Sequence, residues 1–223
     1  MHTRERTVIV TEVSSAIGFS IAHACLMHGH NVVGSALTPE RMRVSARLGH
    51  PGQFAFVVGD IAKPAATRTL FDTAIERFGR VDVLINNLSG VVAKPLADYS
   101  NEDLEYMVAA PLRGFVYLSR HAARYMSARR CGHIVSVTAS VAMQGREQVT
   151  TQLPSLLAGG VDHATRALAA DLAPCNVMVN LIAPETFISR QTTGTAGTTP
   201  DLTIQRIVDV VLHVAGLADA LSR

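Results

Sequence analysis

Side chains that could transfer protons are unevenly distributed along this sequence. The four tyrosines and two lysines, whose side chains can act as general acids or bases, all lie within the first 125 residues. They are Tyr99, Tyr106, Tyr117, Tyr125, Lys63 and Lys94. Farther along, Ser140 and His163 could meet in space as a nucleophile and its base, but nothing in the sequence requires it. We expect both residues to serve packing instead.

A second group of reactive side chains, His23, Cys25, His28 and His30, is crowded into one short stretch. Such side chains can hold a metal ion only when they converge on one point. On the predicted helix, positions 23 and 25 lie about 200° apart, so their side chains diverge and we predict no metal site. The cysteines number three and show no Cys-x-x-Cys spacing, which is typical of reduced thiols in a cytoplasmic protein.

The elements that must position these residues alternate between short β-branched runs and longer helical stretches. We predict strands at 7–11, 31–35, 54–58, 81–85, 132–137 and 177–182. We predict helices at about 17–28, 65–78, 102–127 with an interruption at Pro111, 154–173 and 204–215. Apolar strands separated by helices indicate a doubly wound parallel sheet with helices on both faces, in a single domain spanning residues 1–223.

Composition excludes several classes of protein. Hydrophobic residues make up 48% of the chain and charged residues 17%, which is typical of a globular domain with a large core. The net charge is only +2, and the pair Arg129–Arg130 is the nearest approach to a basic patch, so we predict no nucleic-acid partner. No apolar run approaches the ~20 residues of a membrane span, and no signal peptide is recognisable. We expect a soluble, cytoplasmic protein.

Four motifs in order carry a resemblance to a known family. Thr11-Glu-Val-Ser-Ser-Ala-Ile-Gly18 follows the first predicted strand, and Asp82-Val-Leu-Ile-Asn-Asn87 accompanies the fourth. Gly132-His-Ile-Val-Ser-Val137 forms the fifth strand and Val179-Asn-Leu-Ile-Ala-Pro184 the sixth. Over residues 5 to 222, the chain resembles the short-chain dehydrogenase/reductases, and most of all the β-ketoacyl-carrier-protein reductases among them. The resemblance implies a Rossmann-like α/β/α fold and a nicotinamide cofactor.

The first motif departs from the family pattern Thr-Gly-x-x-x-Gly-x-Gly, in which glycines let the backbone approach the cofactor pyrophosphate at a helix N-terminus. Here Glu12 and Ala16 replace the first two glycines, and only Gly18 is retained. A carboxylate about 4 Å from a phosphate charge would cost roughly 4 kcal/mol at an effective dielectric near 20. We therefore expect Glu12 to oppose cofactor binding, unless its side chain turns toward solvent and binding is only weakened.

The resemblance places further cofactor contacts by position, with Asp60 toward the adenine and Asn86 beside the adenine ribose. The full set of expected contacts is Thr11, Ser14, Ala16, Ile17, Gly18, Asp60, Ile61, Asn86, Asn87 and Pro184. No acid follows the second strand to bind a ribose 2′-hydroxyl, so NADP is favoured over NAD if a cofactor binds at all. Arg41 and Arg43 are candidate partners for its 2′-phosphate, with ordinary exposed helix positions as the alternative.

The catalytic positions of the family are occupied by residues without its chemistry. In the family, Asn, Ser, Tyr and Lys carry out the reduction; their positions fall here on Pro111, Ala139, Pro154 and Ala158. Because no tyrosine or lysine follows residue 125, no change of alignment can supply the Tyr-x-x-x-Lys pair. General acid–base catalysis contributes about 10²–10⁴-fold, so turnover by the family mechanism is not expected.

Three functions are compatible with this pattern. The first is a non-catalytic subunit or binding module that forms a homodimer, or pairs with an active paralogue, through the helices near 102–127 and 154–173. The second is a non-redox enzyme, such as a cyclase or lyase, in the same cleft. The third is an ordinary NADP-dependent 3-oxoacyl reductase. Because the sequence stops at Arg223, directly after its last helix, we expect the sheet to lack the final family strand, which puts the usual family tetramer in doubt.

Overall fold

A computed structural model describes residues 5–41, 48–50, 52–88, 92, 94–138, 152–183 and 200–217. The strands are β1 (Thr7–Val10), β2 (Asn31–Ala36), β3 (Phe54–Val58), β4 (Val83–Asn87), β5 (Gly132–Val137) and β6 (Val177–Ile182). The helices are α1 (Ala16–Met27), α3 (Pro64–Phe78), α4 (Asn101–Val108), α5 (Phe115–Arg129), α6 (Gln152–Leu172) and α7 (Pro200–Val214). Short turns are η2 (Leu96–Asp98), the π-helical η3 (Ala109–Gly114) and η6 (Ala173–Cys175).

The six strands form one parallel sheet, as the sequence predicts, and their order is β3-β2-β1-β4-β5-β6. Strand β1 is central, with Ile9 paired to Val33 on one side and Leu84 on the other. The chain runs outward from β1 to β3 and then crosses back to β4. Ligands of such sheets bind where the strand order reverses, at the carboxyl ends of the strands, so the β1–β4 junction positions the site. Among the described residues, the sheet has no seventh strand.

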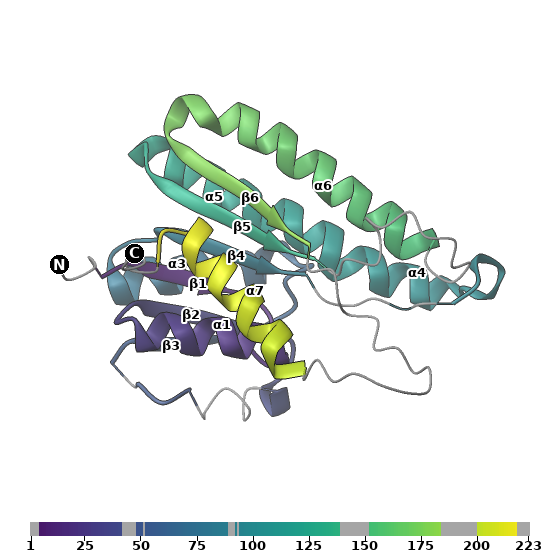
Figure 1. Cartoon of the computed structure of the whole chain (residues 1–223), viewed down its shortest axis with the longest axis horizontal. Coiled ribbons are helices and arrows are strands. Elements are labelled where there is room, and N and C mark those ends of the chain that lie inside the picture. The colour runs from purple at the N-terminus through teal and green to yellow at the C-terminus, as the bar shows by residue number, and fades with distance from the viewer. Residues whose placement is uncertain are drawn as a thin grey trace.

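Helices cover both faces of the sheet (Figure 1), and an apolar layer lies between the sheet and the helices on each face. On one face, Val8, Val10 and Val83 pack with buried residues of α1 and α7. On the other, Ile9, Leu84 and Ile134 pack with residues of α3 and α5, and partly buried residues of α6 join them. Successive strand residues enter opposite layers because side chains alternate along a strand. Both layers are apolar, so the strands read as continuous hydrophobic runs rather than alternating ones.

The structure corrects one predicted strand and confirms the interruption predicted in the long helix. The fourth strand was expected at 81–85 but lies at Val83–Asn87, because Asp82 precedes the strand and binds the neighbouring backbone. The helix expected at 102–127 is divided into α4, η3 and α5. Pro111 lies inside η3, where its missing N–H group rules out an α-helical hydrogen bond at that position and favours the wider turn.

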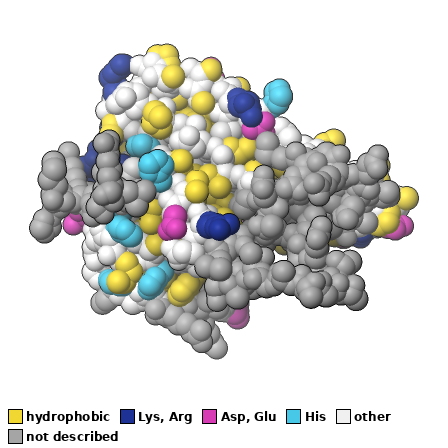
Figure 2. Space-filling view, in the orientation of Figure 1, with side chains coloured by type: hydrophobic (Ala, Val, Ile, Leu, Met, Phe, Trp, Pro, Cys, Tyr) yellow, Lys and Arg dark blue, Asp and Glu magenta, His cyan; other side chains and the backbone are white. Residues whose placement is uncertain are grey.

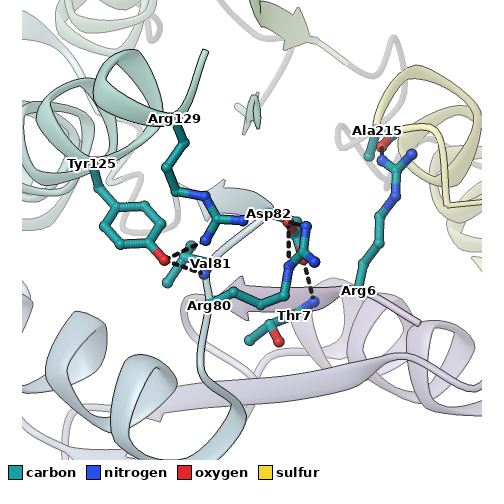
Figure 3. Close-up of polar contacts among 8 residues, drawn as sticks. All are labelled: Arg6, Thr7, Arg80, Val81, Asp82, Tyr125, Arg129 and Ala215. Carbon is teal, nitrogen blue, oxygen red and sulfur yellow. Dashed lines mark hydrogen bonds and ion pairs between the residues drawn. The ribbon is translucent and has the colours of Figure 1, made fainter. Parts of the chain in front are cut away.

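Side chains at the amino ends of the strands connect elements that are distant in sequence (Figure 3). Asp82 Oδ2 accepts a hydrogen bond from Thr7 N at 3.0 Å, and its Oδ1 accepts one from Arg80 Nε at 2.8 Å. Arg6 donates to the carbonyl of Ala215 at the end of α7, at 3.2 Å. The Thr7 contact joins β1 to the start of β4, and the Arg6 contact holds the end of α7 against the sheet.

Two histidines bind the carbonyl groups at the same end of α7. His133 Nδ1 donates to Val214 O at 3.2 Å, and His30 Nε2 donates to Leu217 O at 2.9 Å. Burial, assisted by the Arg6 guanidinium, lowers the pKa of His133 below its ordinary value of 6.5. The ring is therefore neutral near pH 7 and binds as an N–H donor. Like Arg6, these rings supply hydrogen bonds that the end of a helix lacks within itself.

Candidate functional site

The turn between β1 and α1 is closed by a fully bonded serine. Ser15 caps α1: its Oγ accepts from Gly18 N at 3.1 Å and donates to Glu12 O at 2.9 Å. The same oxygen accepts from Asn87 Nδ2 at 2.8 Å, which connects the turn to the end of β4. Ser15 was absent from the predicted contacts; its position three residues before Gly18 is the N-cap signal that could have identified it. The turn is therefore held by one hydroxyl group.

Gly18 is required by the close approach of the turn to its own helix. A Cβ atom at this position would lie 2.3 Å from Glu12 O and 3.0 Å from Asn87 Nδ2. The first two residues of α1, Ala16 and Ile17, have N–H groups with no acceptor inside the helix, and Ala16 is exposed. This is the arrangement that binds anions at helix N-termini, so the predicted contacts Ala16, Ile17 and Gly18 lie together.

Glu12, at the position of the first family glycine, has an unusual backbone and a charged neighbour. Its φ of 55° lies in the left-handed region, which side chains other than glycine rarely adopt. Its carboxylate lies 3.8 Å from the guanidinium of Arg41 and is largely buried, with 12% of its side chain exposed against 53% for Arg41. Glu12, which was expected to oppose cofactor binding, thus pairs with Arg41, one of the two arginines expected to bind the 2′-phosphate of NADP.

Thr11 and Asn87 join β1 to β4 at the carboxyl edge. Thr11 Oγ1 accepts from Asn87 N at 2.9 Å and donates to Asn87 O at 3.4 Å. The neighbouring Asn86 turns the other way: it is fully buried, and its Nδ2 donates to Ser119 of α5 at 3.4 Å. Asn87 therefore lies at the turn, whereas the Asn86 side chain faces the core instead of the expected ribose.

Asp60 and Ile61 follow β3 on the neighbouring edge of the sheet. Asp60 Oδ1 accepts from Ala62 N at 2.9 Å, so this carboxylate already stabilises its own turn while remaining partly exposed. Ile61 is buried and packs against the position of Gly114, where a Cβ would meet its Cδ1 at 3.0 Å. Ser14 is half-buried in the β1–α1 turn. Pro184, Arg43, Ala139 and Ser140 lie outside the described residues.

The region beyond the carboxyl ends of β4 and β5 has apolar surroundings. Leu88, Phe115 and Val161 form a small buried cluster, against which the partly buried Leu112 and Leu181 pack. Pro154 is buried in the first turn of α6, where a missing N–H group costs little, and Ala158 follows one turn later. Neither residue can exchange a proton or donate a hydrogen bond from its side chain.

The tyrosines and lysines are engaged elsewhere. Tyr99 donates to Val92 O at 2.6 Å, beside the ion pair between Lys94 and Asp103. Tyr125 lies at the amino end of the strands, where its hydroxyl accepts from Arg129 at 2.6 Å (Figure 3). These contacts place both tyrosines on segments other than α6.

The histidine-rich stretch disperses its side chains. Cys25 is buried, and burial raises the pKa of its thiol to about 12. His28 binds Ala24 O within its own helix end, His23 stacks on Phe19, and His30 faces α7. Figure 2 shows histidine side chains spread over this face rather than gathered at one point. Among the described residues, no three His, Cys, Asp or Glu side chains come together as metal ligands do, and no helix is long and apolar enough to cross a membrane.

Comparison with known proteins decides the family. The sequence pattern of the short chain dehydrogenase family matches residues 6–198. The chain belongs to this family. An uncharacterized oxidoreductase of Thermotoga maritima is 29% identical over 190 residues, which cover 83% of this chain and 73% of that protein. The peroxisomal 2,4-dienoyl-CoA reductase of Rattus norvegicus is 29% identical over 184 residues, covering 81% of this chain and 62% of that enzyme.

The crystal structure of 3-ketoacyl-(acyl-carrier-protein) reductase from Brucella melitensis, complexed with NADH, superposes with a TM-score of 0.73. The match covers 80% of this chain and 74% of that one at 24% sequence identity, which establishes the fold. With the family pattern, it confirms the predicted Rossmann-like α/β architecture and the resemblance drawn from the four motifs.

In this family member, the residues that would contact the diphosphate of a nicotinamide dinucleotide suit their ligand better than those expected at the nicotinamide end. Toward the diphosphate, the N-terminus of α1 and the close approach at Gly18 are present. At the positions that the resemblance assigns to the family's tyrosine and lysine, α6 carries Pro154 and Ala158, whose side chains can neither hydrogen-bond a ribose nor move a proton. The residues present therefore fit the diphosphate half but do not fit a nicotinamide positioned for hydride transfer.

Proposed function

We propose that this chain is a short-chain dehydrogenase family member that does not transfer hydride and serves as a binding or regulatory subunit. The observation that carries the proposal is the absence of any tyrosine after residue 125 and any lysine after residue 94, combined with Pro154 and Ala158 on α6. An enzyme of this family without its acid and its ammonium group loses the protonation of the developing alkoxide. The fold and the diphosphate-binding turn are retained without that chemistry.

Ketone reduction by the purified protein should be at least about 10²-fold slower than by an active 3-ketoacyl reductase assayed in parallel, because acid–base catalysis contributes about 10²–10⁴-fold. The assay follows NADPH and NADH oxidation with acetoacetyl-CoA and with a 2,4-dienoyl-CoA, the substrate named for the rat relative. A turnover number within a hundredfold of that of the control enzyme would contradict the proposal and would favour an ordinary reductase instead.

We further propose that the chain pairs with a second chain of the same fold, its own copy or an active paralogue, through α4–α5 and α6. Leu156 of α6 is 69% exposed, an unusual position for a leucine. On the same helix, a Cβ at Gly159 or Gly160 would meet nothing within 4 Å, so a partner helix could approach closely. This combination favours helix-to-helix association.

Light scattering coupled to size exclusion should report a dimer at micromolar concentration, for the chain alone or mixed with a co-encoded reductase. Leu156→Arg should shift that species to the monomer, since it introduces a charge at the proposed contact, while Met178→Arg on the edge strand serves as the matched control. The pairing would be refuted if the chain were monomeric both alone and with the reductase, or if the two substitutions changed the fraction of dimer equally.

A further inference from the structure

The pair formed by Glu12 and Arg41 joins the β1–α1 turn to the segment that follows β2. In dinucleotide-binding folds of this kind, the end of β2 carries the acid that binds the ribose hydroxyls, or an arginine that receives a 2′-phosphate. Here Val13 N donates to Ser35 O at 3.0 Å, so the β1–α1 turn is bonded directly to the end of β2. The Glu12 carboxylate thereby lies beside the segment after β2, although it belongs to the β1–α1 turn.

The backbone of the turn holds Glu12 in place. Its carbonyl oxygen accepts from Ser15 N and from Ser15 Oγ, both at 2.9 Å, and Gly18 packs closely against it. The left-handed φ of 55° sets the direction in which the side chain leaves this turn. The carboxylate then lies 3.8 Å from Arg41, largely shielded from water. It cannot move away from this position by a shift of the backbone alone.

We propose that Glu12 determines cofactor selectivity by excluding dinucleotides that carry a 2′-phosphate, so that the chain prefers NADH to NADPH. A 2′-phosphate approaching Arg41 would meet a carboxylate that already occupies this guanidinium. A ribose 2′-hydroxyl carries no charge and can donate a hydrogen bond to the same carboxylate. This proposal is the alternative to the expectation that Arg41 favours NADP. The inference rests on the proposed function in one respect, that the chain binds a dinucleotide. It does not require that turnover is absent.

The size of the effect follows from the charges. One pair of like unit charges about 4 Å apart at an effective dielectric near 20 corresponds to roughly a thousandfold in affinity. The positive charge of Arg41 and the salt of the buffer reduce this repulsion. We therefore expect NADH to bind at least about tenfold more tightly than NADPH at low ionic strength, with the difference shrinking as salt is added.

Calorimetric titration with NADH and with NADPH tests the inference on four proteins: wild type, Glu12→Gln, Arg41→Gln and the control Glu40→Gln. Glu12→Gln removes the charge at nearly constant volume and should raise NADPH affinity about tenfold or more, with NADH changed by less than about threefold. Arg41→Gln should weaken NADPH further, because the carboxylate then lacks its counter-charge. Glu40→Gln makes the same change in net charge on an exposed neighbouring residue and should leave the ratio unchanged.

Three outcomes would overturn the inference: NADPH binding to the wild type as tightly as NADH, a ratio that Glu12→Gln and Glu40→Gln change equally, or no binding of either dinucleotide by the wild type and by Glu12→Gln. Thermal unfolding of each variant confirms that the fold is kept. Ketone reduction by the wild type would refute the proposed function and leave the ratio of affinities untouched, so the two failures are distinguishable.

Discussion

Asp82→Ala will lower the free energy of unfolding by about 3–5 kcal/mol, the usual cost of removing one partner from a buried ion pair. The Asp82 side chain is only 5% exposed; one of its oxygens accepts from Thr7 N of β1, and the other accepts from Arg80, just before β4. Without it, the Thr7 N–H of the central strand loses its acceptor, and the guanidinium of Arg80 remains half-buried without a counter-charge. Urea unfolding followed by circular dichroism measures the difference.

Arg80→Gln is the matched control. The Arg80 side chain is 27% exposed, and its removal leaves the Thr7–Asp82 hydrogen bond intact, so we expect a smaller loss, about 1–2 kcal/mol. A loss below about 1 kcal/mol for Asp82→Ala, or equal losses for the two variants, would show that the carboxylate contributes no more to the sheet edge than a surface ion pair does.

Gly18→Ala will destabilise the fold by about 2–3 kcal/mol, because the new methyl group would overlap a backbone atom. Its Cβ would lie 2.3 Å from the carbonyl oxygen of Glu12, which two hydrogen bonds from Ser15 hold in place. Relief of the overlap requires the turn to open, so the hydrogen bond from Asn87 to Ser15 should weaken as well. Chemical unfolding reports the stability, and NADH titration reports the turn.

Gly159→Ala is expected to change the stability of the chain in the opposite direction to Gly18→Ala. A Cβ at Gly159 meets nothing within 4 Å, and the residue lies inside α6, where alanine is favoured over glycine by about 1 kcal/mol. We expect this variant to be more stable than the wild type. If both glycine substitutions shifted stability in the same direction, the contact between Gly18 and the turn would not be the reason for the retained glycine.

The proposed loss of the family's acid–base residues has a different basis from the stability of the fold. It depends on which residue types the chain contains, since a phenol or an ammonium group cannot appear where the sequence has none. The structure adds that Pro154 and Ala158 lie in the first turns of α6 and that apolar side chains surround the neighbouring region. Proline and alanine therefore suit a packed helix start, and neither has a side chain that could donate a proton.

The α/β architecture could be predicted from the sequence alone. So could the bounds of β3, β5 and β6, which match the predicted ranges 54–58, 132–137 and 177–182. These predictions were possible because strands buried on both faces are continuous apolar runs, and the helices between them end at recognisable signals such as Gly79. The predicted strand at 81–85 was two residues early: β4 begins at Val83, although the backbone of Asp82 already bonds Thr7 and His133.

The directions of the side chains at the carboxyl edge could not be predicted from the sequence and were known only from the folded chain. Asn86 and Asn87 are adjacent and chemically identical, yet Asn86 faces α5 and Asn87 binds Ser15. Glu12 could be judged an obstacle to phosphate from its charge, but its pairing with Arg41 depends on the left-handed turn and on the contact of that turn with β2. Such directions are set by neighbours distant in the chain, whereas local periodicity reports only which segments are buried.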